Sequence, residues 1–487
     1  MLNARRGILR LAVLVLVTLA SGQASAEKKV LPPQLSAALR GSGVPADAAA
    51  VVVQEIGATH PLVQWNVDRP MNPASTMKLL TTLAGLELLG PSYTWRTEVY
   101  AQGEQTGDSL TGDLVLKGYG DPKLTLENFW LLLQELRSRG LREIRGDLVI
   151  DRSFFDVEIG DPGRFDNEPT RPYNVLPDAL LLNFKSVRLQ FVPAPDRRSV
   201  QIIASPELPE LVLLNQVTPY DGACESWPER PQPQGDSTLL FEGPFPIGCG
   251  ERARSFALLS PDQYVHSLFR KLWSELNGSF NGTVRIGKPS STARLLLTWQ
   301  SPPLSELIRD INKFSNNVMA RQLFLTLSAD EDPPGSIQKS TDKVRRWLQE
   351  VGIDANELVL ENGAGLSRIE RISAGSLARI LLRAYAGALM PEYLASLPIV
   401  GVDGTARHRL NGSPATGRAH IKTGSLEGVR AIAGYVLDHR GKWLVVVSIV
   451  NHPSAGAAQS FQDAVIEWAY QRGSDTCCNS CRQCAIR

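Results

Sequence analysis

Apolar residues occupy most faces of residues 72–89, which predicts a helix buried on all sides rather than an amphipathic surface helix. Asn72 is expected to cap the N-terminus of this helix, and the Gly-Pro pair that follows residue 89 stops it. Ser75 and Lys78 are three residues apart, so their side chains become neighbours on one face of the first turn. The pattern therefore predicts a hydroxyl and an amine held together in apolar surroundings.

Over residues 96–257 the pattern changes to short β-like runs separated by turns rich in Gly, Pro and Asp. Residues 112–116 and 146–150 have similar sequences and flank a helical stretch over 126–139. Two similar units are too few for a solenoid. We expect a strand–helix–strand element within a β-rich region.

Helical patterns return after Ser260, and the last part of the chain has β-like runs before a final helix. The expected helices cover 261–276, 303–314 and 318–327, with Ser315-Asn316-Asn317 at the junction of the last two. The expected strands cover 418–425, 431–437 and 443–450, and the final helix covers 455–470. This order predicts an α/β fold with an antiparallel sheet edge near Lys422.

The chain has 487 residues, of which 43% are hydrophobic and 21% charged, as in large globular proteins. Its formal net charge of +1 does not favour nucleic acid or an electrostatic membrane grip as a partner. We therefore expect no nucleic-acid partner and at most peripheral membrane association.

The N-terminus has the composition of a secretory signal. Three arginines precede an apolar run over residues 11–20, and an Ala-Ser-Ala sequence at 24–26 supplies small residues for cleavage. The run is too short to span a bilayer. We expect residues 1–26 to be a signal peptide and the mature chain to start near Glu27 in the periplasm. A retained membrane anchor is the alternative.

Cysteine usage agrees with export. Cys224 and Cys249 are the only cysteines before the tail and could close one disulfide in an oxidising compartment. Residues 474–487 contain four more, with overlapping Cys-x-x-Cys spacings that suit either metal binding or disulfides. No histidine or second ligand cluster lies near them, so we expect a disordered tail without a metal site.

Three short motifs carry the candidate chemistry: Ser75-x-x-Lys78, Ser315-x-Asn317 and Lys422-Thr423-Gly424. A Ser-x-x-Lys pattern occurs four times and Ser-x-Asn twice, so neither is informative alone. Only Ser75 opens a predicted buried helix, and Lys-Thr-Gly occurs once, on a predicted strand. The ordered set is typical of acyl-transferring serine enzymes that use no catalytic histidine.

A serine hydroxyl is a poor nucleophile until a base removes its proton. Lys78 can act as that base only as a neutral amine, so its pKa must fall from about 10.4 toward 7, which costs about 4 kcal/mol. Burial and a second cation, Lys422, both lower the pKa of Lys78. The oxyanion is expected between the backbone N–H groups of Ser75 and Ser425, and one such donor contributes about 2.7–4 kcal/mol.

The remaining motif residues suit proton transfer and substrate binding. Ser315 can pass a proton between the base and the leaving amine, and Asn317 can hold a peptide carbonyl and the amine of the base. Lys422 and Thr423 can bind a free carboxylate, each for about 1.5–3 kcal/mol. Gly424 lets a substrate backbone lie close to the strand. A carboxylate site beside the scissile bond favours a carboxypeptidase.

The six histidines leave a Ser-His-Asp triad open by number alone. No Gly-x-Ser-x-Gly elbow or His-Glu-x-x-His pattern accompanies them, and the glycines form no dinucleotide fingerprint. We therefore expect the histidines on the surface or in the core, and neither a metal nor a cofactor.

The motifs resemble those of class C low-molecular-mass penicillin-binding proteins, the D-alanyl-D-alanine carboxypeptidases and endopeptidases of the penicillin-binding protein 4 type. The resemblance covers nearly the whole chain after the expected signal peptide. It includes residues 72–78, 361–367, 401–405 and 420–424.

The resemblance implies an α/β (α+β) fold: a serine β-lactamase-like transpeptidase domain split by a long β-rich insertion that forms two extra domains. We expect the catalytic domain over 27–95 and 258–473 and the insertion over 96–257. The 240 residues between Ser75 and Ser315 agree with an insertion of this size.

The resemblance also implies roles for the motif residues. Ser75 becomes the acylated serine, Lys78 its base and Ser315 the relay, while Lys422 and Thr423 anchor the carboxylate. The implied activity is D-Ala-D-Ala carboxypeptidase and endopeptidase action on peptidoglycan stem peptides, with β-lactams as covalent inhibitors.

Two alternatives stay open. A β-lactamase shares the acylation step, but the long insertion argues against it. A non-catalytic peptidoglycan-binding scaffold is the other, and the complete set of motif side chains argues against that.

Overall fold

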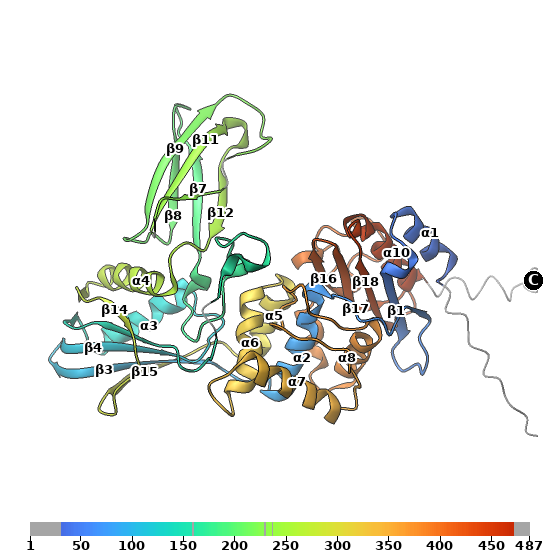
Figure 1. Cartoon of the computed structure of the whole chain (residues 1–487), viewed down its shortest axis with the longest axis horizontal. Helices are drawn as coiled ribbons and strands as arrows, with labels where there is room; N and C mark the ends of the chain where they lie inside the picture. The colour runs from blue at the N-terminus through green and yellow to red at the C-terminus, as the bar shows by residue number, and fades with distance from the viewer. Residues whose placement is uncertain (1–30, 158–159, 228–229, 236, 472–487) are drawn as a thin grey trace, which may run out of the picture.

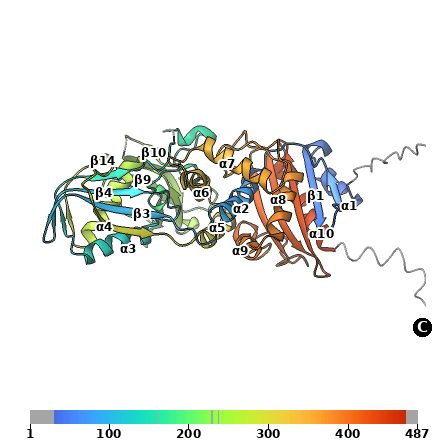
Figure 2. The same cartoon turned by 90° about the horizontal axis from the view of Figure 1, so that it is seen from below.

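The computed structural model describes residues 31–157, 160–227, 230–235 and 237–471. The expected signal peptide over 1–26 and the Cys-rich tail over 474–487 lie outside these residues. The molecule is elongated, with one lobe built from both ends of the described chain and another built from its middle (Figure 1). Figure 2 shows the same division from below.

The first lobe contains a five-stranded antiparallel sheet in the order β16-β17-β18-β1-β2. Its strands are β1 (Ala49–Glu55), β2 (Val63–Trp65), β16 (Ala419–Leu426), β17 (Val429–Leu437) and β18 (Trp443–Asn451). Successive residues of β1 alternate between two apolar clusters: Ala50 and Val52 join one, and Val51 and Val53 join the other. The sheet is thus buried on both faces, and β16 forms one edge, as predicted.

Helices cover both faces of this sheet. On one face lie α1 (Pro33–Gly41) and α10 (Gln459–Gln471), and on the other lies α8 (Ala374–Ala386). Helix α2 (Lys78–Leu88) packs against α8, α5 (Leu304–Lys313) and α6 (Asn317–Ala329). All residues from Lys78 to Leu86 are buried, which confirms a helix enclosed on every side.

The expected start of this helix was wrong. Ser75 lies in a 3₁₀ turn, Ala74–Met77, and the α-helix begins at Lys78. Asn72 does not cap the helix: its side chain accepts from Ala74 N and donates to the Ser367 carbonyl. Ala74, just before Ser75, has a positive φ of 45°, and the 3₁₀ turn that carries the hydroxyl then runs directly into the α-helix.

The second lobe contains a seven-stranded sheet with the path β13-β5-β4-β3-β15, joined through β4 by β6, which also pairs with β14. Its strands are β3 (Arg96–Thr106), β4 (Ser109–Gly118), β5 (Glu143–Ile144), β6 (Leu148–Asp151), β13 (Ser279–Phe280), β14 (Val284–Ile286) and β15 (Arg294–Gln300). Strands β4 and β6 are parallel and connected through α3 (Leu126–Ser138), so the strand–helix–strand element is confirmed.

The packing moves the end of the insertion from residue 257 to about Gln300. Strand β15 pairs antiparallel with β3, and Gln300 lies opposite Arg96. Helix α4 (Pro261–Glu275) buries Leu268 and Phe269 in the same apolar cluster as the seven-stranded sheet. Helical periodicity after Ser260 could not show which core this helix would join, so the expected boundary came too early.

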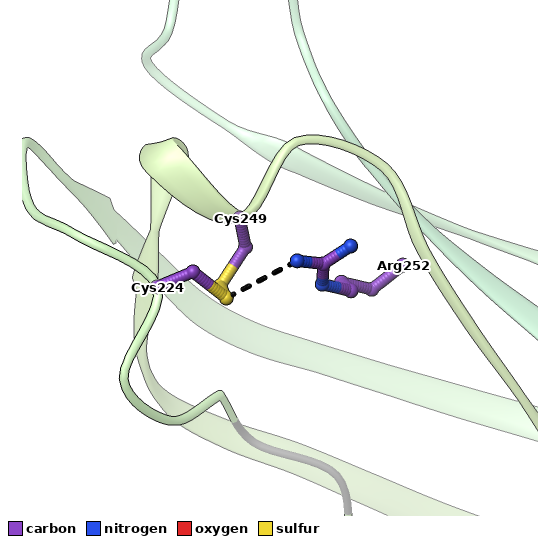
Figure 3. The surroundings of a disulfide bond; sticks show 3 residues. All are labelled: Cys224, Cys249 and Arg252. Atoms are coloured by element: carbon purple, nitrogen blue, oxygen red, sulfur yellow. Dashed lines mark hydrogen bonds between the residues drawn. A yellow bond between two sulfur atoms is a disulfide. The ribbon is translucent and has the colours of Figure 1, made fainter. Parts of the chain in front are cut away.

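Two three-stranded sheets complete this lobe: β12-β7-β8 and β10-β11-β9. Their strands are β7 (Val187–Pro193), β8 (Val200–Ser205), β9 (Val212–Tyr220), β10 (Gln232–Pro233), β11 (Thr238–Pro246) and β12 (Arg252–Phe256). A disulfide joins Cys224 to Cys249, beside the side chain of Arg252 (Figure 3). The predicted fold class, an α/β core with a long β-rich insertion, is confirmed.

Among the residues that the structure describes, no helix is both long enough and apolar enough to cross a bilayer.

Candidate active site

The three motifs meet between α2, the α5–α6 junction and the edge strand β16. Lys78 Nζ lies 3.0 Å from Ser75 Oγ, within hydrogen-bond distance, and donates to Asn317 Oδ1 at 2.6 Å. Lys422 Nζ donates to Ser315 Oγ at 2.9 Å. The fold therefore brings together the five predicted catalytic residues, which lie up to 347 positions apart in the sequence.

The α5–α6 junction presents Ser315 because Asn316 starts the next helix. The Asn316 side chain caps α6 by accepting from Met319 N. Ser315 adopts a positive φ of 57°, a conformation that non-glycine residues rarely take. Strain of this kind is commonly retained at functional sites. The turn directs the Ser315 hydroxyl toward Lys422 and Asn317 toward Lys78.

Lys78 is fully buried, and its contacts suit a neutral amine. Burial lowers the pKa of Lys78 well below its usual value, and the nearby Lys422 cation lowers it further. Besides Ser75, the amine contacts two carbonyl oxygens: Oδ1 of the Asn317 side chain and the main-chain oxygen of Ala364. A neutral amine has two N–H donors for these oxygens, which leaves its lone pair for the Ser75 hydroxyl proton.

Lys422 is also fully buried and reaches the Thr423 carbonyl at 2.8 Å as well as Ser315. Burial lowers the pKa of Lys422 to about 7. Each of the two buried amines thus contacts one of the two serines, and the Lys422 cation disfavours a charge on Lys78. This arrangement provides a base and an acid within one pocket.

We expect a bell-shaped dependence of kcat/KM on pH. Activity should rise as Lys78 loses its proton, since only the neutral amine accepts the Ser75 proton, and fall above about pH 7 as Lys422 loses the charge that attracts a carboxylate. The measurement is D-alanine release from a stem peptide across pH 5–10.

Lys422→Arg is the matched control, because a guanidinium keeps its charge throughout this range. The falling limb should then disappear. An unchanged falling limb in this variant would contradict the assignment to Lys422.

The edge strand β16 brings a backbone amide to the reacting position. The Ile421 N–H points away from the sheet, toward the Pro398 carbonyl, so the N–H of Ser425, four residues on, points to the same side. Gly424 lies against the Ser75 turn: a Cβ placed there would be 3.1 Å from Ser75 N. The amides of Ser75 and Ser425 can therefore face one oxygen atom.

Sequence reasoning missed Glu370, which organises the loop behind Lys78. Its Oε1 accepts from the backbone N–H groups of Glu361, Asn362 and Gly363 at 2.9–3.1 Å. The same loop carries the Ala364 carbonyl that receives Lys78. Burial raises the pKa of Glu370, while the three backbone donors favour its ionised form. Its partners are all main-chain groups, so no side-chain motif pointed to it.

Glu370→Ala should lower the free energy of unfolding by about 3 kcal/mol or more, because three backbone donors lose their acceptor. It should also slow penicillin acylation, since the loop that receives Lys78 loses its support. Urea unfolding and acylation rates measure the two effects. Glu350→Ala, at an exposed position of α7 (Ile337–Glu350), is the control. Unchanged stability in Glu370→Ala would refute this role.

Sequence reasoning also missed two contacts that fix the position of Thr423. Thr423 Oγ1 contacts Thr405 Oγ1 at 2.8 Å. The turn that carries Thr405 is tied to α5 by an ion pair between Lys313 Nζ and Asp403 Oδ2 at 2.5 Å. Residues 401–405 were noted as part of the resemblance, but their contact with Thr423 follows only from the fold.

All six histidines lie in the described part of the chain, and there none hydrogen-bonds Ser75. His420 packs against Trp443, and His266 lies in the second lobe beside Glu210. A Ser-His-Asp triad at Ser75 is therefore excluded.

The chain matches the D-Ala-D-Ala carboxypeptidase 3 (S13) family over residues 31–472. It is 28% identical over 418 residues to the D-alanyl-D-alanine carboxypeptidase DacB of Haemophilus influenzae, covering 84% of this chain and 86% of that protein. It is 28% identical over 451 residues to the D-alanyl-D-alanine carboxypeptidase of Actinomadura sp. strain R39, covering 89% and 83%.

Solved structures give the same result. Penicillin-binding protein 4 (dacB) of H. influenzae superposes with a TM-score of 0.77 at 26% identity, covering 90% of this chain and 99% of that one. Its complex with a β-lactam superposes with a TM-score of 0.73 at 25% identity. These matches confirm the resemblance stated from the motifs, and with a family match over nearly the whole described chain, the protein belongs to the D-Ala-D-Ala carboxypeptidase 3 (S13) family.

Proposed function

We propose that the protein is a serine-type D-Ala-D-Ala carboxypeptidase that cleaves peptidoglycan stem peptides through an acyl-serine intermediate. The observation that carries this proposal is the contact of a buried amine, Lys78 Nζ, with Ser75 Oγ at 3.0 Å. Family membership gives the substrate class.

In the first half-reaction, Lys78 takes the proton of Ser75 as Oγ attacks the carbonyl carbon of the penultimate D-alanine. The carbonyl oxygen becomes an oxyanion between the amides of Ser75 and Ser425. When the C–N bond breaks, the leaving amine must gain a proton. Ser315, hydrogen-bonded to Lys422 at 2.9 Å, is assigned to pass the proton of protonated Lys78 to this amine, which returns Lys78 to its neutral form.

In the second half-reaction, a water molecule attacks the ester formed on Ser75. Neutral Lys78 takes a proton from this water and returns it to Ser75 Oγ as the ester bond breaks, so that both the serine hydroxyl and the neutral amine are restored. Asn317 holds the Lys78 amine through its Oδ1 atom in both steps.

Substrate binding is assigned to the edge of β16. Thr423, with Lys422 behind it, binds the terminal carboxylate, and Gly424 leaves room for the peptide backbone beside the Ser75 turn. This geometry favours cleavage next to a free carboxylate.

The same chemistry extends to D-alanyl cross-links, in which the leaving amine carries its own carboxylate, so we include endopeptidase action in the proposal. Purified enzyme should release D-alanine from a stem pentapeptide and convert a cross-linked muropeptide dimer to monomers. Absence of D-alanine release would refute the carboxypeptidase, and an intact dimer would refute the endopeptidase.

β-Lactams should acylate Ser75 as substrate mimics. The H. influenzae relative has been solved in complex with a β-lactam, which supports this expectation. A penicilloyl adduct lost within seconds would favour the alternative of a β-lactamase. A persistent adduct together with D-alanine release would exclude both that alternative and the non-catalytic scaffold.

We place the protein in the periplasm. The composition of residues 1–26 supports export, and the Cys224–Cys249 disulfide supports an oxidising compartment. N-terminal sequencing of protein from the periplasmic fraction should give a start near Glu27. Recovery of the uncleaved chain from the membrane fraction would refute this placement and favour an anchor.

A further inference from the structure

A cavity of about 220 Å³ opens beside the carboxylate-binding edge of β16. Its lining includes Thr423, Gly424 and Ser425 of β16, Arg430 of the neighbouring strand β17 and Gln462 of α10. The cavity is large enough to hold several water molecules. The methyl side chain of a terminal alanine would fill a small part of it.

Among the described residues that line the cavity, two are arginines and none is acidic. Arg409 is neutralised, because both its Nε and Nη2 donate to Asp463 Oδ1 at 2.6–2.8 Å. Lys422 lies behind the wall, fully buried, with donors committed to Ser315 and Thr423.

Arg430 differs from both of these cations. It is half-buried, and it forms no ion pair with a carboxylate in the described part of the chain. Its Nη1 donates to Ser425 Oγ at 2.5 Å, since Arg430 lies directly opposite Ser425 in the β16–β17 pair. A guanidinium has five N–H donors, so most of its capacity remains for a ligand.

The Arg430 guanidinium lies beside the strand that binds the substrate carboxylate. Ser425 supplies an amide that faces the Ser75 turn, and its hydroxyl holds Arg430 in place. A carboxylate bound by Thr423 would lie in the wall of the same cavity. Guanidinium groups bind carboxylates through two parallel N–H···O bonds.

We propose that Arg430 is a further substrate-binding residue, which pairs with the carboxylate of the leaving group while the cavity holds the rest of that group. This inference rests on the proposed function of the Ser75 site. It adds a leaving-group preference: an amine component with a carboxylate and a side chain longer than that of alanine, as in the acceptor strand of a cross-link.

The test is a thermodynamic cycle between residue 430 and the carboxylate. One substrate is a stem peptide ending in D-Ala-D-Ala, and the other ends in the corresponding amide. In the wild type, amidation should lower kcat/KM strongly. Arg430→Gln should lower kcat/KM about 10- to 100-fold for the free acid, mainly through KM, and leave the amide within about twofold.

Two variants separate charge from structure. Arg430→Lys should recover part of the loss on the free acid, because it restores the charge. Arg407→Gln removes an exposed arginine from the neighbouring turn, outside the cavity wall, and should behave as wild type. Equal losses on acid and amide, or no loss on the acid, would overturn the assignment of Arg430.

The same cycle measured as peptide binding in a Ser75→Ala background is independent of turnover. Lack of coupling there overturns the role of Arg430 alone. Lack of D-alanine release by the wild type, with coupling intact, overturns the proposed catalysis alone. In the wild type, a cross-linked dimer, whose leaving group has the longer side chain, should have a higher kcat/KM than the pentapeptide, and an equal or lower value would refute the leaving-group preference.

Discussion

Ser75→Ala should reduce D-alanine release by about 10⁵-fold or more, the scale seen when the nucleophile of a serine hydrolase is removed. Besides Ser75 Oγ, the Lys78 amine contacts two carbonyl oxygens, and neither can act as a nucleophile. Residual turnover would come from binding and the oxyanion amides alone. D-alanine release and intact mass after penicillin exposure measure the effect.

The mass measurement identifies the acylated residue. Wild-type protein should gain one penicilloyl adduct, and Ser75→Ala none. Ser279→Ala, at an exposed strand position in the other Ser-x-Asn sequence, should be acylated like the wild type. An undiminished adduct on Ser75→Ala would remove Ser75 from the mechanism.

Lys78→Arg should lower the acylation rate by about 10³- to 10⁴-fold, the upper part of the range for losing a general base. A guanidinium does not give up its proton in proteins, so the variant keeps a cation next to Ser75 but lacks a lone pair. The site favours the neutral amine, because burial and the Lys422 cation lower the pKa of Lys78. Stopped-flow penicillin acylation and D-alanine release measure the loss.

Lys343→Arg is a matched control, since Lys343 of α7 is another mostly buried lysine, which pairs with Glu331 and lies outside the motifs. It should retain normal acylation. If Lys78→Arg acylates within about tenfold of the wild type, proton transfer must pass through another group, and Lys422 would be the next to test.

The elements near the motifs followed from local sequence. Helix α5 has an apolar face, α6 is buried from Val318 to Ala329, and the Ser-Asn-Asn sequence between them supplies the cap, so the junction was predictable. Helices α7, α8 and α9 (Met390–Ser396) and strand β1 were not predicted. The apolar residues of β1 form one continuous run, and a sheet buried on both faces shows no alternation that distinguishes it from a buried helix.

The site residues that belong to short sequence motifs were predictable. Spacing placed Ser75 and Lys78 together, and motif order associated them with Ser315 and Lys422. Contacts that form only in the folded chain could not be read from sequence. Glu370 binds main-chain amides, and Arg430 meets Ser425 through strand pairing. The complete burial of Lys422 depends on the packing of segments far apart in the chain.

The pairing of Arg96 with Gln300 continues into the connecting residues, where Trp95 and Ser301 exchange hydrogen bonds through their main chains and the Ser301 hydroxyl. The chain thus leaves the lobe that contains Ser75 and returns to it at two neighbouring positions, Trp95 and Ser301. The residues between these two positions therefore form an insertion whose two ends are paired with each other. Such an insertion can become shorter or longer during evolution without a change in the strand order of the five-stranded sheet. Its contacts with peptidoglycan can therefore change while the catalytic residues keep their positions.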